Sequence, residues 1–271
     1  MVTHLAPAWQ LEVFQRSLKK RLKVDLLRRH LGDCSRQRCL LVTCGDNNGA
    51  INYRLKEAGG DWRWAELEPH HIQDMEAFLG EAVRHAEPGR LPFDADAFET
   101  VVSIDVHEHL VDPRPFCSEL YRVVRPGGRV IVTVPNGDWW KPANLIKRLV
   151  GMTEEKYGHV RIGYNLRELQ ELLGTVGFRP YATGSYSKFF TEMLELGINF
   201  GYVMVLSRRS PVKVEQGTIA PSSASQLGAV SGAYRLYTAV YPVLRLISRL
   251  DRVLPFTTGY AVVVEARRPA S

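Results

Sequence analysis

The chain has 271 residues, which is enough for one large α/β domain with additional elements. Its formal net charge of +6 is spread along the sequence, so charge alone indicates neither a nucleic-acid partner nor a membrane partner. The four cysteines form no CxxC pair, which argues against a zinc ribbon or a disulfide framework and predicts reduced thiols in a cytoplasmic protein. No uncharged apolar run reaches 18 residues, so no membrane-spanning helix is expected.

Residues 8–31 have the pattern of a basic amphipathic helix, and we assign residues 1–35 to this N-terminal segment. Apolar residues recur at spacings of three and four, and lysines and arginines occupy most other positions. The helix can cap a sheet and show its charges to water, or it can contact anionic lipid. The apolar positions are Leu11, Phe14, Leu18, Leu22 and Leu26.

The segment Arg38–Glu68 predicts half of a nucleotide-binding α/β unit. Glycine and asparagine tolerate positive φ, so the turn between its strand and its helix can be sharp and leave room for a ligand. A carboxylate, Glu66, follows roughly 20 residues after that turn, where it can accept hydrogen bonds from ribose hydroxyls. The expected parts are a strand at 39–42, a turn at 45–49, a helix at 50–58 and a strand at 62–67.

Further strands and helices alternate after this unit. A helix is expected at 70–78, with a short third strand ending near Leu79, just before Gly80-Glu81-Ala82. A helix at 113–124 is expected to stop at Arg125-Pro126-Gly127-Gly128, because proline and glycine disfavour its continuation. The fourth strand is expected at 101–104, the fifth at 130–134 and the sixth at 181–186.

Three motifs occur in order within LPFDADAFETVVSIDVHEHLVDPRPFCSELYRVVRPGGRVIVTVPN. They are the pair Glu108-His109 after the fourth strand, the run from Arg122 to Gly128, and Pro135-Asn136 after the fifth strand. In this order they resemble the central motifs of class I S-adenosylmethionine-dependent methyltransferases, with the quinone-biosynthesis-like, small-molecule branch as the nearest relative. The resemblance covers about residues 39–178. It implies a Rossmann-like α/β fold with a seven-stranded sheet whose last strand is antiparallel.

The resemblance also implies a binding site for the cofactor S-adenosyl-L-methionine. The turn would lie under the methionine and ribose, Glu66 would hold the ribose hydroxyls, and Glu81 would accept from the adenine amino group. Ser103 and Asp105 would line the methionine end. Carboxylates suit hydroxyl and amino donors, and a tight turn lets the backbone approach the ligand. The turn residues implied are Cys44, Gly45, Asp46 and Gly49.

Three positions depart from the family pattern. Leu41 stands where the family has an acid, and Thr43 and Asn47 stand where it has glycines. Asp46 would be able to supply a lost cofactor contact. The departures leave two functional hypotheses: a methyltransferase, which we favour because the later motifs are intact, and a non-catalytic binding or scaffold protein with the same fold.

At the acceptor end, His159 and His109 are the candidate catalytic residues. An imidazole has an ordinary pKa near neutral pH, so it can remove a proton from an acceptor hydroxyl. Residues 139–161 are expected to form a lid that carries Trp139, Trp140, Tyr157 and His159. Asp105, Glu108 and His109 stand at i, i+3 and i+4, which can hold a divalent ion or can simply orient a loop. We assign no metal ligand from the sequence.

The methyltransferase core is assigned to residues 36–186. A helical insertion with a flexible linker is expected at 187–257, and the last strand and tail at 258–271. The insertion is either a helical cap or homodimer interface, or a monotopic patch on a membrane surface. The predicted function is methyl transfer to a small, lipophilic acceptor, by O- or C-methylation. No nucleic-acid partner is expected. The predicted location is the cytoplasm, with peripheral membrane attachment as the alternative that the insertion leaves open.

Overall fold

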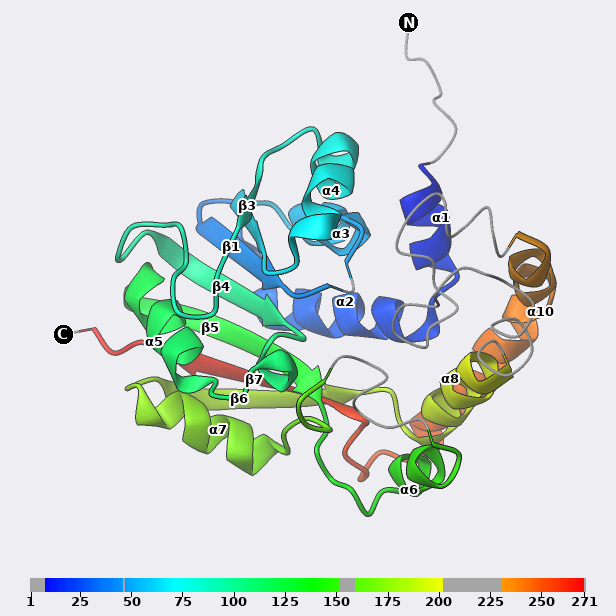
Figure 1. Ribbon diagram of the computed structural model, residues 1–271. Helices are drawn as coiled ribbons and strands as arrows, with labels where there is room; N and C mark the ends of the chain where they lie inside the picture. The colour runs from blue at the N-terminus through cyan, green and yellow to red at the C-terminus, as the bar shows by residue number, and fades with distance from the viewer. Residues whose placement is uncertain (1–7, 46, 152–158, 202–230, 271) are drawn as a thin grey trace, which may run out of the picture.

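The computed structural model describes residues 8–45, 47–151, 159–201 and 231–270 (Figure 1). Seven strands form one sheet in the order β3-β2-β1-β4-β5-β7-β6. The neighbours from β3 to β5 are parallel, whereas β7 is antiparallel to both β5 and β6. The predicted fold class is therefore confirmed. The strands are β1 (Arg38–Thr43), β2 (Asp61–Glu66), β3 (Val83–His85), β4 (Phe98–Ile104), β5 (Val124–Pro135), β6 (Arg179–Tyr186) and β7 (Ala261–Arg267).

The central strands are short apolar runs because both faces of the sheet are covered. One face packs against α5 (Arg114–Val123) and α7 (Leu166–Thr175), which contribute side chains such as Phe116 and Leu169 to the first core. The other face packs against α2 (Leu18–Leu31), α3 (Ala50–Lys56) and α4 (Ile72–Leu79), whose Leu27, Leu55 and Met75 enter the second core. Figure 1 shows the two helical layers on either side of the sheet.

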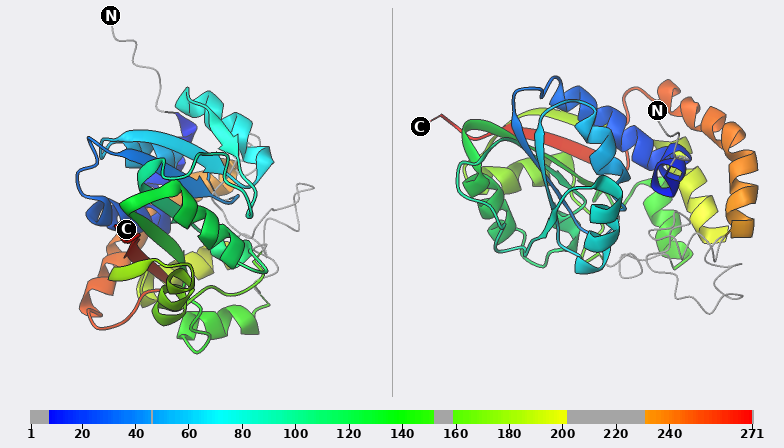
Figure 2. Two further views of the ribbon diagram at one scale, coloured as in Figure 1. Left: turned by 90° about the vertical axis from the view of Figure 1, so that its left-hand side faces the viewer. Right: turned by 90° about the horizontal axis from the view of Figure 1, so that it is seen from above.

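A further group of helices gathers beyond the carboxyl ends of the parallel strands (Figures 1 and 2). It comprises α6 (Pro142–Leu149), α8 (Phe189–Gly201) and α10 (Ser231–Ser248). Helix α8 contacts α6, α10 and α2, so it joins the N-terminal helix to the C-terminal ones. Among the described residues, no helix combines the length and the apolar character that crossing a membrane requires.

The N-terminal segment differs from the single helix predicted at 8–31. It forms two helices, α1 (Trp9–Gln15) and α2, which are separated by Arg16 and Ser17. The Ser17 side chain accepts a hydrogen bond from the Lys20 backbone N–H and so caps the second helix. Apolar periodicity continues across this break, so periodicity alone did not reveal it.

The position predicted for the third strand is wrong. Residues up to Leu79 belong to α4, which ends at Gly80 in a left-handed conformation, and β3 begins only at Val83. Met75 packs into the second core with full burial, which holds this segment as a helix on the sheet. The consequence is that Glu81 precedes β3 instead of following it.

The helical insertion predicted at 187–257 contains α8 and α10. Helix α10 runs from Ser231 to Ser248 and continues as the short helix η6 (Arg249–Val253). Asp251 of η6 accepts hydrogen bonds from the backbone N–H groups of Lys188 and Phe190, which fixes the start of α8. Most of the linker expected within this insertion lies outside the described residues, because residues 202–230 are not described.

Candidate active site

The carboxyl edge of β1 and β2 is organised around Glu66, the last residue of β2. Its side chain is fully buried. One oxygen accepts from the Gly45 N–H at 2.8 Å and the Glu68 N–H at 2.9 Å, and the other accepts from the Thr43 hydroxyl at 2.5 Å. Burial raises the pKa of Glu66, and these hydrogen bonds oppose that shift. Glu66 therefore fastens the turn after β1 to the end of β2.

Local sequence explains the shape of that turn. Gly49 has φ +88°, and a Cβ there would lie 2.8 Å from the Phe78 ring, so glycine is required. Asn47 accepts from the Gly49 N–H at 3.1 Å and donates to Asn52 at 2.6 Å. Cys44 is buried, and its pKa is raised by burial. Asp46 lies outside the described residues.

Two departures from the family pattern have structural roles here. Leu41 is fully buried in the second core, where a carboxylate would be costly. Thr43 donates its hydroxyl to Glu66. Neither substitution leaves an unpaired polar group at the edge of the sheet.

Glu81 does not lie at this edge. It precedes β3, at the amino end of the strand, where it accepts from Trp64 Nε1 at 2.6 Å and pairs with Lys56. Glu66 and His85 are register partners in parallel strands, so the carboxyl edge of β3 follows His85. The adenine role expected for Glu81 is therefore wrong, because the error in the third strand placed this acid after the strand.

Ser103 and Asp105 both lie at the carboxyl end of β4. The Ser103 hydroxyl is buried without a hydrogen-bond partner among the described residues. Asp105 has φ +50°, its backbone N–H donates to the Thr133 carbonyl at 2.9 Å, and its side chain forms an ion pair with Lys23 of α2. The N-terminal helix therefore reaches the edge of the sheet with a buried ammonium group.

Lys23 was not among the predicted site residues, although the sequence carries a signal for it. Lys23, Leu27 and Leu31 stand at i, i+4 and i+8, so the lysine occupies the same helical face as two buried leucines. A cation on an apolar face needs a buried partner. Lys23 was grouped with the basic residues expected to face water, so its place on the apolar face was missed.

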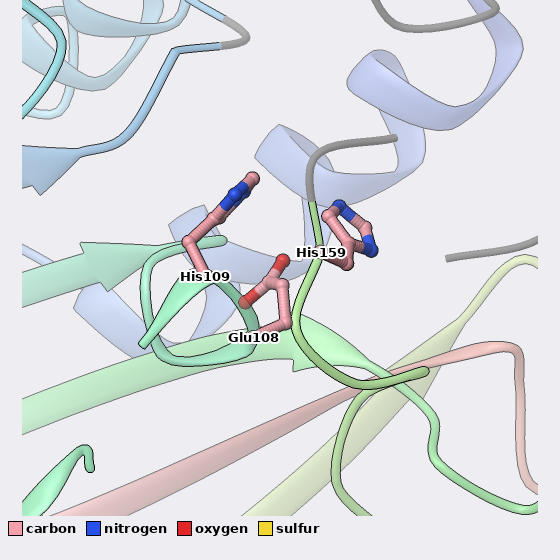
Figure 3. A group of neighbouring side chains, drawn as sticks. All are labelled: Glu108, His109 and His159. Atoms are coloured by element: carbon pink, nitrogen blue, oxygen red, sulfur yellow. The ribbon is translucent and has the colours of Figure 1, made fainter. Parts of the chain in front are cut away.

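Glu108, His109 and His159 lie together next to Asp105. Each offers one ligand atom, and these atoms lie within 4.8 Å of one another. Glu108 and His109 come from the short helix η2 (His107–His109), and His159 comes from a separate segment (Figure 3). The Val160 N–H donates to the Glu108 carbonyl at 2.9 Å and brings this segment close. In the structure His159, and not Asp105, completes the group with Glu108 and His109. Asp105 instead pairs with Lys23.

Burial favours the neutral forms of Glu108 and His159. Glu108 is fully buried, and neither carboxyl oxygen has a hydrogen-bond partner among the described residues. Burial and the nearby charge of Asp105 raise its pKa well above the ordinary value. Burial and the neighbouring His109 lower the pKa of His159 to about 4. A neutral His159 can accept a proton, and one carboxylate with two imidazoles is also a suitable ligand set for a divalent transition metal.

A cavity of about 150 Å³ adjoins His159. Glu192 of α8 is buried in its wall and accepts from Lys147, Lys19 and Ser187. Burial alone would raise the Glu192 pKa, but the two lysines lower it to about 2. Trp139 and Trp140, expected in the lid, are 58% and 59% exposed and lie outside the cavity lining, and Tyr157 is outside the described residues. Other lining residues include Asn136, Asn144, Leu196 and Tyr260.

Comparisons with known proteins agree with this fold. A family model described as a methyltransferase domain matches residues 81–132. A Mycolicibacterium smegmatis protein described as an S-adenosylmethionine-dependent methyltransferase is 36% identical over 96 residues, which cover 35% of this chain and 34% of that protein. The demethylmenaquinone methyltransferase of Clavibacter sepedonicus is 42% identical over 48 residues, or 18% of this chain and 20% of that protein. The matches thus cover at most about a third of these curated relatives.

Two solved structures show how widely the fold is used. Geranyl diphosphate C-methyltransferase from Streptomyces coelicolor, solved with Mg²⁺, geranyl diphosphate and S-adenosyl-L-homocysteine, matches with a TM-score of 0.54 and 15% identity over 92% of this chain and 77% of its own. The cyclase SpnF matches with a TM-score of 0.55 and 15% identity over 93% and 82%. The fold alone therefore does not fix the reaction. Residues 81–132 thus match a methyltransferase domain, and the chain has the Rossmann-like fold of class I methyltransferases.

Proposed function

We propose that the chain transfers the methyl group of S-adenosylmethionine to an oxygen or carbon atom of a small, lipophilic acceptor. The observation that carries this proposal is the joint position of two sites at one edge of the sheet. The turn at Cys44–Gly49 is fastened to Glu66, and the cluster with His159 follows β4, two strands along from β2. Cofactor and acceptor can therefore meet where α/β proteins bind ligands.

In this proposal Glu66 binds the ribose. A carboxylate accepts about four hydrogen bonds, and three internal donors already use Glu66, so a ribose hydroxyl can join as another donor when the turn admits the cofactor. The backbone at Cys44, Gly45 and Gly49 would lie under the methionine and ribose. Ser103 and Asp105 line the methionine end, and the unpartnered Ser103 hydroxyl supplies a donor there.

Methyl transfer from a sulfonium requires in-line placement of the acceptor and, for a hydroxyl, removal of its proton. His159 is our candidate general base, because it lines the cavity and is neutral at pH 7; its lowered pKa makes it a weaker base than an ordinary imidazole. His109 lies beside it, with ring centroids 4.7 Å apart, and positions or relays the proton. The non-catalytic alternative loses support because Leu41 and Thr43 have structural roles.

A divalent cation on Glu108, His109 and His159 is a second way to activate an acceptor oxygen. Its support is the buried Glu108 carboxyl, whose two oxygens lack hydrogen-bond partners in the described part of the chain. A cation would compensate the charge of that carboxylate and polarise the acceptor. Titration with Co²⁺ tests this, because visible absorption bands that Glu108→Gln abolishes are expected, and featureless spectra would contradict it.

We also assign the exposed face of α10 and η6 to a peripheral contact with anionic lipid, which would suit a lipophilic acceptor. Seven apolar side chains are exposed along this segment and the loop after it, and Phe256 is 99% exposed. Arginines flank them and match anionic headgroups. The apolar residues are Leu236, Val240, Val243, Leu246, Leu250, Val253 and Phe256, and the arginines are Arg235, Arg245, Arg249 and Arg252.

The proposed activity is tested with S-adenosylmethionine that carries an isotopic label in its methyl group. The purified chain is incubated with phenolic and prenylated acceptors, and label in the extracted product is counted. Transfer to one acceptor class, absent with heat-treated protein, is expected. Cofactor binding without transfer to any acceptor would favour the non-catalytic alternative.

A further inference from the structure

Five arginines surround a hollow of about 630 Å³ that is separate from the candidate active site. The hollow lies at the amino half of β1 to β4, whereas the active-site residues lie at the carboxyl ends of these strands. Leu91, Pro92 and Phe93 form part of its wall. The arginines are Arg38, Arg63, Arg84, Arg90 and Arg122, and the carboxylates that line the hollow are Asp94 and Glu119.

The sheet register places three of these arginines in a row. Leu40 pairs with Arg63, and Ala65 pairs with Arg84. Arg38 stands two residues before Leu40, and Arg63 two before Ala65, so all three side chains leave the same face of adjacent strands. Further along the strands this face carries apolar core residues, including Leu40 and Ala65. The three arginines therefore take the place of apolar core side chains at the amino end of this face.

The charges of the row are only partly neutralised. Arg63 pairs with Asp61 at 2.5 Å, and Arg122 pairs with Glu119 at 2.6 Å. Within the described ranges, no carboxylate forms an ion pair with the guanidinium groups of Arg38, Arg84 or Arg90, although Glu99 accepts a hydrogen bond from the Arg38 backbone N–H at 2.7 Å.

Rings and carbonyls hold two of these three guanidinium groups instead. Arg38 lies 5.9 Å from the centre of the Phe98 ring, and Arg84 lies 5.0 Å from that of Phe93 and donates to the Pro92 carbonyl at 2.7 Å. These contacts orient the groups but leave their positive charge available to an anion.

We propose that this hollow binds a small molecule that carries two or more linked phosphate groups. Guanidinium groups donate pairs of parallel hydrogen bonds that match phosphate oxygens. Three adjacent strands span roughly 10 Å, which a single phosphate does not bridge. The volume lies within the range of small-molecule sites, and the loop wall makes the site concave, which favours a small ligand over a flat macromolecular surface.

Calorimetric titration of the full chain with tripolyphosphate tests the proposal. We expect saturable binding that weakens as salt is added. The double variant Arg38→Gln/Arg84→Gln should bind at least about tenfold more weakly, since charge-assisted hydrogen bonds are lost. Arg167→Gln is the matched control, because Arg167 is exposed on α7 and pairs with Glu171 away from the hollow. Absence of saturable binding, or equal weakening in the control, would overturn the proposal.

A second variant, at an exposed residue, distinguishes loss of the binding site from a folding defect. Arg90→Glu changes an exposed loop residue that lines the hollow, and it should also weaken tripolyphosphate binding. Unchanged affinity in this variant would overturn the proposal, as would single-stranded RNA that competes and binds more tightly than tripolyphosphate. S-adenosylhomocysteine affinity should stay unchanged in all these variants, which separates the phosphate site from the proposed methyltransferase site.

Discussion

Glu108 shows how burial changes the chemistry of a single residue. Its carboxyl group is fully enclosed, and a raised folded-state pKa means that the folded chain binds a proton that the unfolded chain has released. Between the unfolded and folded pKa values, stability therefore falls as pH rises, by up to about 1.4 kcal/mol per pH unit. Below the unfolded pKa this penalty vanishes.

We predict that Glu108→Gln becomes progressively more stable than the natural chain between pH 5 and pH 8. Glutamine cannot ionise, so the variant lacks the penalty of a buried carboxylate. Urea unfolding with EDTA present, at several pH values, measures the difference, and Glu171→Gln on the exposed face of α7 is the control. Parallel stability curves for Glu108→Gln and the natural chain would show that Glu108 titrates normally.

His159 carries the second prediction at this scale. Replacing it by glutamine should lower the turnover number for a hydroxyl acceptor by about 10² to 10⁴. Cofactor affinity should be unchanged, because His159 lines the acceptor cavity and the cofactor turn follows β1. Single-turnover kinetics with labelled cofactor check this, and a variant that transfers methyl groups at the natural rate would exclude His159 as the base.

Among the elements, α2 links the N-terminal segment to the candidate site. Lys23 is buried and pairs with Asp105, and Lys19 pairs with Glu192 in the cavity wall. The helix therefore brings positive charge to two carboxylates on different elements. The same face of α2 therefore packs against the sheet and carries the lysine that reaches the candidate site.

We predict that Lys23→Met destabilises the chain by about 1–3 kcal/mol, because Asp105 would be left without its cation. Adding Asp105→Asn should recover much of this loss, which urea unfolding of the single and double variants measures as a coupling energy. Arg29→Met on the exposed side of α2 is the control. Additive effects of the two substitutions would mean that the ion pair does not contribute to stability.

For the whole molecule, the exposed apolar face of α10 and η6 predicts attachment to anionic vesicles. The variant Leu236→Glu/Val243→Glu should lose most of the binding to phosphatidylglycerol vesicles in co-sedimentation, since two charges would enter the apolar layer. Val111→Glu, at another exposed position, is the matched control. If the natural chain forms a dimer that the variant dissociates, without binding vesicles, the face is a homodimer interface instead.

The pattern of apolar runs and turns predicted much of the fold, because each buried parallel strand is a short apolar run in the sequence. Most strand positions and the turn beside Glu66 were accessible in this way, whereas the seven-stranded sheet with its antiparallel last strand was implied by the family resemblance. Glu81 was misplaced because α4 and β3 lie within a few residues and short apolar runs do not distinguish them. The pairing of Lys23 with Asp105 and the approach of His159 to Glu108 depend on long-range packing, which local periodicity does not encode.

The proposed function depends above all on binding of S-adenosylmethionine by the turn beside Glu66. Calorimetric titration of the purified chain with S-adenosylmethionine and S-adenosylhomocysteine tests it most directly, with Glu66→Ala as the variant and circular dichroism as the check on folding. We expect micromolar binding of both ligands to the natural chain and at least about tenfold weaker binding to Glu66→Ala, through loss of charge-assisted hydrogen bonds. Folded natural chain that binds neither ligand would contradict it.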